Sequence, residues 1–542
     1  MPRVAPPEPA VTGLARSREL GRGLAAAHAT AAEAEALPLV LGESSRLVRE
    51  HADAAEIDRE GRLPEALRTR VAEAGLFGLT VPEAHGGAGV SLKSACAVVA
   101  EIARVERSTA IMIGLHSGLG TRPLVELGDE ALKARLLPEI ASGACIAAFA
   151  ATEAQAGSDL TGIRTTGSVE GDELRIDGEK VYVTNGGFAG CYSVLARTPG
   201  LGGARAHSLL LVPRDTPGVS VGPEEDKLGI RGSSTVTVYF DGARVPRQNV
   251  LGEAGRGIDQ AHAALAWGRT LMAAGCVGTA QAALDLTLAH VTTRQQFGKP
   301  IGDFSASRAH VARMASRHYA AETLVRWVGH ALAEGEPIDE LSLLAKVLAS
   351  EASFEICDRA IQLHGALGFI EPTGVARLLR DCRITRIFEG ANDVLLVRGG
   401  TAVLSRRPSL SRASLATEVD PDLEREAKAW DALHARLTDA RLSVAKEHGV
   451  GVVRHQLVLQ AVARANLCLV TALATLLRAS SAAGASEREL GRHASEDLLL
   501  EAERHLDDLA RAVRDEARVH AVSEHLYAPL RRPAAAEPES PK

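Results

Sequence analysis

RLLRDCRITRIFEGAND, residues 377–393, is the stretch from which both the fold and the chemistry of this chain can be inferred. One of its carboxylates, Glu389, stands between the apolar pair Ile387–Phe388 and Gly390. An apolar flank removes water from a carboxylate and raises its proton affinity, which a general base near neutral pH requires. Gly390 lets a backbone approach a ligand closely. The simpler alternative is a solvated loop carboxylate without function. A run of cations precedes it: Arg377, Arg380, Arg383 and Arg386.

The wider block, from QLHGALGF (362–369) to the end of this stretch, resembles the end of the acyl-CoA dehydrogenase core. The family pattern there is Q-x-x-G-G-x-G, then R-D-x-R-I, then I-Y-E-G-T. In that family the Glu of the last pattern removes the α-proton of the substrate. The resemblance therefore implies that Glu389 is the base and Gly390 a substrate contact, with Ala391 and Asp393 beside the flavin. Ala391 replaces the usual Thr, which puts one hydrogen bond to the flavin in question.

Length and composition describe a multidomain globular protein. A chain of 542 residues is too long for one ordinary core and predicts two to four domains. With 46% hydrophobic and 24% charged residues, it is predicted to be soluble. A net charge of −7 argues against nucleic acid as a partner, because phosphate binding needs a basic surface.

Cysteine usage and hydropathy bear on the compartment. The seven cysteines are scattered, without C-x-x-C or metal-ligand spacing, so free thiols in a cytoplasmic protein and no metal site are expected. No run of about eighteen apolar residues is present, so no membrane span is predicted. The first twelve residues are Pro-rich and lack the apolar core of a targeting signal.

Helical periodicity dominates both ends of the chain. In the middle, segments such as ELRIDGEKVYVTNGG and STVTVYFDGARVP alternate with a period of two, which predicts antiparallel strands. The expected α+β architecture has an N-terminal α domain, a middle β-barrel domain, an α-helical bundle and an extra C-terminal helical domain. The predicted boundaries are 1–39 (flexible), 40–146 (α), 147–258 (β), 259–405 (bundle), 406–420 (linker), 421–530 (helical) and 531–542 (tail).

Two segments of the β region carry the resemblance further. TEAQAGSD (152–159) is similar to the family's T-E-P-x-x-G-S-D, and VYVTNGG (181–187) is similar to its W-I-T-N-G. Both flank the flavin in the family, so FAD is the implied cofactor; taken alone, they are a strand-end turn and an alternating strand. The residues implied to bind FAD are Phe149, Thr152, Ser158, Tyr182 and Thr184, and Ser158 is also an implied substrate contact.

A third flavin segment implies an oligomer. RQQFGKP (294–300) is similar to the family's R-x-x-F-G, which reaches the diphosphate and adenine of FAD across a subunit interface. An Arg suits this role because its fork pairs with phosphate oxygens. QLHG (362–365) matches the other half of that site, although Ala366 replaces its second Gly. The implied residues are Arg294, Phe297, Gln362, His364 and Gly365, and a homodimer is favoured.

Arg269, in LAWGRT on the long helix, stands where an Arg contacts the substrate in the family. The alternative is a surface salt bridge. Three residues earlier, Ala266 replaces the Asp or Asn of many relatives, which puts one substrate contact in question. Some relatives carry the base directly before this Arg, where this chain has Gly268, so Glu389 has no evident substitute.

The resemblance covers about residues 40–403, and the helical extension beyond it looks most like the very-long-chain branch. The implied activity is α,β-dehydrogenation of acyl-CoA thioesters to trans-2-enoyl-CoA, with electrons passed to an electron-transfer flavoprotein. HSGLG (116–120) has small residues at the expected pocket floor and favours long chains. Peripheral membrane contact through the extension is a further expectation. Two alternatives remain: an oxidase-like flavoenzyme of this fold, and a non-catalytic assembly factor.

Overall fold

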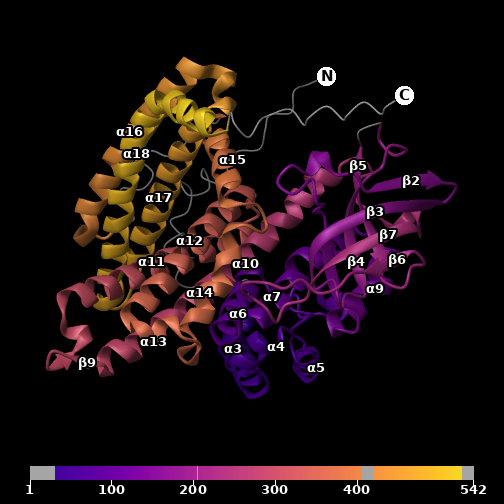
Figure 1. The fold of residues 1–542 in the computed structure, drawn as a ribbon, viewed down its shortest axis with the longest axis horizontal. Coiled ribbons are helices and arrows are strands. Elements are labelled where there is room, and N and C mark those ends of the chain that lie inside the picture. Colours follow the sequence, from indigo (N-terminus) through magenta and orange to yellow (C-terminus); the bar gives the residue numbers. More distant parts are fainter. Residues whose placement is uncertain (1–30, 204–205, 406–418, 528–542) are drawn as a thin grey trace, which may run out of the picture.

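The computed structural model describes residues 31–203, 206–405 and 419–527 (Figure 1). A helical N-terminal part, a β-sheet domain, a group of long helices and a C-terminal set of helices follow one another along the chain. Figure 1 shows the sheet at one side of the molecule, the long helices in the centre and the C-terminal helices at the opposite side. The predicted architecture is confirmed.

The N-terminal part consists of short helices whose starts are fixed by side-chain caps. Asp53, Ser91, Glu106 and Asp129 each accept a hydrogen bond from a backbone N–H two or three residues later. The helices are α3 (Ala31–His51), α4 (Ala54–Glu60), α5 (Glu65–Glu73), η1 (Glu83–His85), α6 (Leu92–Val105), α7 (Arg107–Leu115), the π-helix η2 (His116–Gly120), α8 (Arg122–Leu127) and α9 (Glu130–Ser142).

The expected flexible segment 1–39 is wrong for residues 31–39, which form the first turns of α3. Leu37, Val40 and Leu41 of this helix pack partly buried against the main hydrophobic core. Burial of these side chains explains why the Ala-rich start is helical rather than loose. Residues 1–30 lie outside the described part of the chain, as do the predicted tail 531–542 and most of the predicted linker.

The β domain is an eight-stranded sheet in the order β6-β7-β3-β2-β4-β5-β8, with β1 beside β4. Most neighbours are antiparallel, as predicted, but β1–β4 and β2–β4 are parallel. The strands are β1 (Ala147–Ala150), β2 (Thr166–Glu170), β3 (Glu173–Thr184), β4 (Cys191–Arg197), β5 (His207–Pro213), β6 (Val219–Val221), β7 (Thr235–Pro246) and β8 (Val250–Leu251), with short helices η3 (Leu160–Gly162) and η4 (Arg247–Asn249).

The central helices surround α10, which runs for 37 residues from Gly257 to Thr293. It is longer than the roughly 30-residue helix expected from its apolar spacing, and its middle third is buried on all sides. The other elements are β9 (Gln295–Gln296), β10 (Lys299–Pro300), η5 (Ile301–Asp303), α11 (Ser305–Ala333), α12 (Asp339–His364), α13 (Ala366–Phe369), η6 (Glu371–Thr373), α14 (Val375–Arg383), η7 (Ile384–Arg386) and α15 (Asn392–Ser405).

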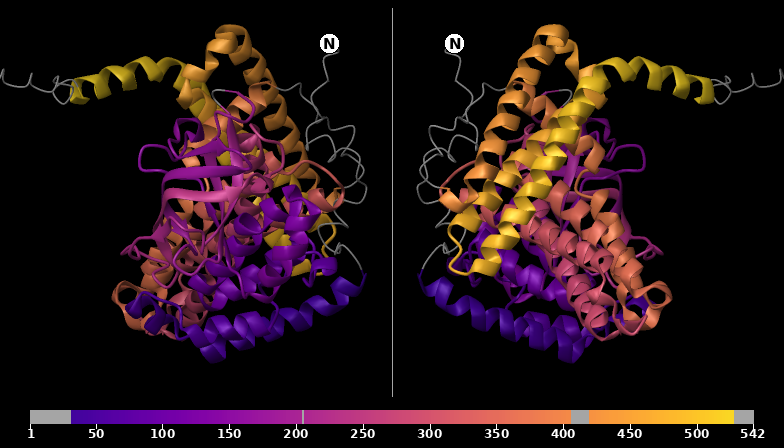
Figure 2. Two further views of the ribbon diagram at one scale, coloured as in Figure 1. Left: turned by 90° about the vertical axis from the view of Figure 1, so that its right-hand side faces the viewer. Right: turned by 90° about the vertical axis from the view of Figure 1, so that its left-hand side faces the viewer.

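The C-terminal helices share the main hydrophobic core rather than forming a separate one. Trp327 of α11 and Leu395 of α15 belong to the same buried cluster as Trp430, Leu473 and Leu498 of the extension. The far end of α18 projects beyond the rest of the described chain (Figure 2). The elements are η9 (Pro421–Leu423), α16 (Glu424–His448), η10 (Gly449–Arg454), α17 (Gln456–Ser480) and α18 (Ala485–Tyr527).

Within the described residues, two helices are long and apolar enough to cross a membrane, α10 and α17. In both helices, 78% of the most apolar stretch is buried inside the protein, which is the pattern of a core helix.

Charged contacts also attach the C-terminal helices to the central ones. Arg317 of α11 pairs with Glu355 of α12 and with Glu501 of α18.

Candidate active site

Glu389 lies in the short connection between η7 and α15, as the sequence predicted. Its backbone is left-handed, with φ of +56°, and Gly390 follows at +102°. A non-glycine residue adopts this conformation only where the surrounding structure holds it. The residue as a whole is half-buried, yet both carboxylate oxygens are buried and have no hydrogen-bond partner within the described residues.

The wall around this carboxylate is apolar and comes from distant parts of the chain. Ile111 and Leu115 of α7, Leu119 of η2 and Ile230 of the loop before β7 form one buried cluster, against which Phe388 packs. Ile387, by contrast, is 50% exposed, so only one member of the adjacent apolar pair helps to exclude water.

Gly268 of α10 leaves the room that this arrangement needs. A Cβ at position 268 would lie 2.5 Å from Leu119 Cδ2 and 3.1 Å from Glu389 Oε2. Both distances are shorter than ordinary van der Waals contact, so any side chain here would displace Leu119 or the carboxylate. Close packing therefore explains why this chain has glycine at position 268.

Burial raises the pKa of Glu389 to about 7, and the nearby cations Arg269, Lys346 and Arg107 partly oppose this shift. The predicted increase in proton affinity is confirmed. Its cause is the wall contributed by α7 and η2 more than the adjacent Ile387. A carboxylate that titrates near neutral pH is suited to take a proton from carbon and to release it again.

Arg269 supports the base loop from α10. Only 3% of the residue is exposed, and its Nε donates a hydrogen bond to the Glu389 carbonyl oxygen at 3.0 Å. Burial lowers its pKa to about 10, so the guanidinium stays charged at neutral pH. The alternative of a surface salt bridge is wrong, because the side chain is buried beside the candidate base.

The arginine run before Glu389 is largely structural. Arg380 pairs with Asp58 of α4 through two hydrogen bonds of 2.9 and 2.6 Å, and Arg386 pairs with Glu351 at 2.9 Å. Asp381 accepts a hydrogen bond from the backbone N–H of Ile230. These contacts join the helical domain to α4 and to the loop that supplies one wall of the base site.

A β-bulge near the end of β3 turns Tyr182 outward. Lys180 pairs with Val238 and Val183 with Val236, so β3 has one residue more than β7 over this interval. Tyr182 has φ of +57° and is 66% exposed. The backbone N–H of Val181 donates to the Thr152 carbonyl at 2.9 Å, which brings the two predicted flavin segments together.

The remaining predicted residues of this group lie around the same edge of the sheet. Thr152 and Thr184 are half-buried, and Ser158 is exposed in the loop after β1. Phe149 is half-buried and packs on the apolar cluster beside Glu389, so β1 adjoins the base site. Ala391 is half-buried directly before α15, whereas Asp393 is exposed in the first turn of that helix.

A buried ion pair under the predicted flavin loop was not foreseen from the sequence. Lys180 donates to Glu153 Oε1 at 2.7 Å and to the Ala151 carbonyl at 3.1 Å, and neither charged side chain is exposed by more than 3%. Burial disfavours the Glu153 carboxylate, but hydrogen bonds from Lys180 and Thr165 hold its pKa at about 2. The one signal in the sequence was that a charged residue, Lys180, stands where the alternation of the strand predicts a buried side chain.

The third predicted group forms a cluster of its own. Arg294 caps the end of α10, and the His290 ring stacks on the His364 ring at 4.3 Å between centroids. Phe297, at the tip of the β9–β10 hairpin, is 93% exposed, and Gln362 and Gly365 are exposed at the end of α12. Figure 1 shows β9 and α13 at the edge of the molecule opposite to β2 and β3. One chain therefore does not bring this group to Tyr182.

The groups at the sheet edge fit a planar cofactor with polar edges. Tyr182 presents an exposed ring beside the half-buried hydroxyl-bearing Thr152 and Thr184, and the Glu389 oxygens lack a protein partner in the described residues. Orphaned buried oxygens in an ordered site indicate that a bound group completes it. The donor set thus fits the flavin that the resemblance implied.

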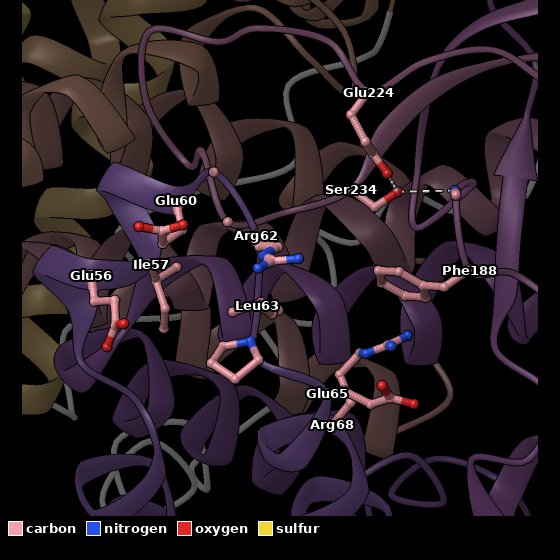
Figure 3. Close-up of a pocket in the computed structure, with 14 residues that line it drawn as sticks. Glu56, Ile57, Glu60, Arg62, Leu63, Glu65, Arg68, Phe188, Glu224 and Ser234 are labelled. Carbon is pink, nitrogen blue, oxygen red and sulfur yellow. Dashed lines mark hydrogen bonds between the residues drawn. The ribbon is translucent and has the colours of Figure 1, made fainter.

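A separate pocket of about 570 Å³ lies between the N-terminal helices and the β domain (Figure 3). Ser234 in its wall donates to Glu224 Oε1 at 2.7 Å, and the Arg68 guanidinium lies 4.9 Å from the centre of the Phe188 ring. Neither Glu389 nor any other predicted site residue lines this pocket. It is therefore distinct from the base site.

The raised pKa of Glu389 predicts a pH-dependent stability difference for Glu389→Gln. A carboxylate whose pKa rises from 4.5 to about 7 on folding costs stability as pH rises between those values. Gln stays neutral, so the variant should be more stable than the wild type by about 3 kcal/mol at pH 8 and equal to it below pH 4.5. Denaturant titrations at pH 8 and pH 4 with equal FAD measure this; a difference that does not depend on pH would contradict it.

Comparisons with known proteins agree with this geometry. Family models of the N-terminal, middle and C-terminal domains of acyl-CoA dehydrogenases match residues 41–144, 148–243 and 255–404. A probable acyl-CoA dehydrogenase of Mycobacterium tuberculosis is 37% identical over 352 residues, which covers 65% of this chain and 90% of the relative.

Two further matches extend into the C-terminal helices. The human mitochondrial very long-chain specific acyl-CoA dehydrogenase is 34% identical over 478 residues, covering 80% of this chain and 73% of the relative. The crystal structure of a Bacillus anthracis acyl-CoA dehydrogenase complexed with FAD superposes with a TM-score of 0.80 at 28% identity, covering 88% of each chain. With three family domains in order around an isolated buried carboxylate, this chain belongs to the acyl-CoA dehydrogenase family.

Proposed function

We propose that this protein is an FAD-dependent dehydrogenase that converts acyl-CoA thioesters to trans-2-enoyl-CoA, with Glu389 as the base. The observation that carries the proposal is the Glu389 carboxylate itself. It is buried in an apolar wall, has no hydrogen-bond partner among the described residues, and has a pKa of about 7. Burial of an unpartnered carboxylate costs stability, and a purely structural role would not offset that cost.

The residues of this chain account for the proton half of the reaction. Glu389 takes the α-proton of the thioester, and the surrounding Leu119 and Phe388 keep water away from the carboxylate. Arg269 holds the Glu389 carbonyl and keeps a positive charge beside the site, which favours the ionised base before proton transfer. Bound FAD would supply the two-electron acceptor for the hydride that leaves the β-carbon.

A long acyl chain is the proposed substrate class. The cluster of Ile111, Leu115 and Leu119 beside the carboxylate is apolar throughout. Gly118 and Gly268 let η2 and α10 approach so closely that a Cβ on Gly118 would lie 3.2 Å from the Gly268 Cα. The relative that matches the C-terminal helices as well as the core is very long-chain specific. The apolar cluster and this relative support a long-chain enzyme, whereas Gly118 and Gly268 serve the close packing of η2 on α10.

We further propose a homodimer that passes its electrons to an electron-transfer flavoprotein. β9 and α13, which directly follow Arg294 and the Gln362 segment in the chain, lie at the edge of the molecule opposite to β3, which carries Tyr182, so a second copy would have to complete each flavin site (Figure 1). The exposed Phe297 at the tip of the β9–β10 hairpin supports the view that a second copy covers this surface.

We further expect the enzyme to be cytoplasmic and to contact a membrane peripherally through its C-terminal helices. Fractionation of cells into soluble and membrane material tests this location.

The deciding experiment is anaerobic titration of the purified protein with acyl-CoA thioesters of short, medium and long chain. Bound FAD should make the protein yellow, and long chains should bleach it most completely. Reoxidation by electron-transfer flavoprotein rather than by oxygen distinguishes a dehydrogenase from an oxidase. A colourless protein that gains no absorbance with FAD would overturn the proposal, and yellow protein that no acyl-CoA bleaches would favour the assembly-factor alternative.

A further inference from the structure

A buried lysine on α12 contacts the base loop directly. Lys346 is fully buried, and its ammonium group donates to the Gly390 carbonyl at 2.8 Å and to Asn392 Oδ1 at 2.7 Å. Asn392 in turn donates to Ser350 Oγ at 3.0 Å and to Glu351 Oε1 at 2.7 Å. One helix therefore holds both the residue after the base and the first residue of α15.

Two buried cations thus hold two successive carbonyls of the base loop. Arg269 of α10 donates to the Glu389 carbonyl, and Lys346 of α12 donates to that of Gly390. The left-handed backbone of Glu389 is intrinsically unfavourable and persists only where neighbours hold it. Charged donors form roughly twice as strong hydrogen bonds as neutral ones, which suits them to this task.

The charge on Lys346 also acts on the carboxylate of Glu389. Three cations face that carboxylate, each from a different helix: Arg269 of α10, Lys346 of α12 and Arg107 of α7. Lys346 itself faces the thiol of Cys276 and the carboxylate of Glu351 in addition to the base. Burial lowers the pKa of Lys346 to about 8, so it is mainly charged at the pH at which Glu389 titrates.

We propose that Lys346 is a positioning residue for the base: its ammonium group fixes the Glu389–Gly390 turn and stabilises the ionised form of the Glu389 carboxylate. The proposal rests on the proposed role of Glu389. It goes beyond that role, because Lys346 would act on the base through its charge and its hydrogen bonds, without contacting substrate or cofactor. A lysine that merely tied α12 to the loop would leave the titration of the base unchanged.

The test compares Lys346→Gln and Lys346→Met with the wild type, all loaded with FAD. Gln keeps a donor for the loop but loses the charge, and Met loses both. The proton affinity of Glu389 is read without turnover, from the infrared C=O band of its protonated carboxyl, identified as the band that Glu389→Gln lacks. In both Lys346 variants the midpoint of this band should move to higher pH, because the carboxylate has lost a cation that favoured it.

Anaerobic flavin reduction over a range of pH gives the second readout. At pH 7 the variants should be slower than the wild type by roughly fivefold, because a rise of about one unit in the pKa of the base lowers its ionised fraction from about one half to about one tenth. The difference should shrink as pH rises and the base ionises. Lys346→Met should retain an additional loss at high pH, where only the geometric part of the role is left.

Lys93→Met is the matched control, since it removes a half-buried lysine of the same helical core that packs against Gly329 of α11 instead of the base loop. It should leave the infrared midpoint in place. Unchanged midpoints in both Lys346 variants would overturn the proposal while leaving the base assignment intact. Should neither variant fold, Lys346→Arg, which keeps the charge, must titrate as the wild type does, and a shifted midpoint there would equally overturn it.

Discussion

Glu389→Gln should retain FAD and bind acyl-CoA, yet reduce its flavin at least roughly 10²–10⁴-fold more slowly than the wild type, the range that general-base catalysis contributes. Gln has the size and hydrogen-bonding capacity of Glu but cannot accept the α-proton. The comparison is made at pH 8, where a carboxylate with a pKa of about 7 is mostly ionised in the wild type. Stopped-flow absorbance of the flavin under anaerobic conditions measures the step directly.

No other carboxylate of the described chain is placed to replace it in this structure. Glu351, the acid nearest along the same network, is paired with Arg386 and accepts a hydrogen bond from Asn392. Position 268, where some relatives carry the base, has no side chain. Glu371→Gln makes the same chemical change at an exposed acid ahead of α14 and serves as control. A Glu389→Gln enzyme that reduces its flavin at a near wild-type rate would remove the base assignment.

The parts of this molecule that the sequence predicted are those encoded locally. Helical and strand periods predicted helices towards both ends of the chain and strands in the middle, which is the order of the elements in the structure. The apolar Phe388 beside Glu389 pointed to the raised pKa of that carboxylate. The stretch that carries the base was recognised because its residues are consecutive. In each case the signal and the structure it produces lie within one element or one turn.

What the sequence did not reveal depends on contacts between distant segments. Lys346 reaches Gly390 across 44 positions, and Lys180 reaches Glu153 across 27. In sequence Lys346 is a single charge among apolar neighbours and Lys180 directly follows Glu179, and neither pattern identifies the distant partner. The role of Gly268 is likewise invisible until Leu119 and the carboxylate are placed against it.

The arginine run before Glu389 is a further case in which the sequence does not report the contacts. Arg380 and Arg386 pair with acidic residues on α4 and α12. The cations that act on the base come instead from α7, α10 and α12. Charge density along a chain does not report charge density in space, because consecutive residues of a helix point in different directions.

The second large effect is expected at the buried ion pair beneath the flavin loop. Burial lowers the pKa of Lys180 from 10.5 to about 8, whereas hydrogen bonds hold that of Glu153 at about 2 against 4.5 in the unfolded chain, despite burial. The two pKa shifts are of similar size. At neutral pH the shift of Lys180 lowers the free energy of unfolding, and the shift of Glu153 raises it. The intact pair therefore adds little net stability, as is usual for buried ion pairs.

Removing one partner is a different matter, because it leaves an uncompensated buried charge. Lys180→Met should lower the free energy of unfolding by about 3–5 kcal/mol and weaken FAD binding, since Ala151 and Glu153 flank Thr152 in the flavin loop. The stability that the wild type gains from the lowered pKa of Glu153 is present above pH 4.5 and is lost as pH falls towards 2. The stability loss of Lys180→Met should therefore become smaller between pH 4.5 and pH 2.

The double variant Glu153→Gln/Lys180→Met separates charge from packing. It removes both charges, and it should recover much of the stability that the single variant loses. Denaturant titrations at pH 7 of the wild type, both single variants and the double variant form a complete cycle. Equal losses in Lys180→Met and in the double variant would show that the lost ammonium group with its hydrogen bond to the Ala151 carbonyl, rather than the stranded Glu153 carboxylate, accounts for the effect.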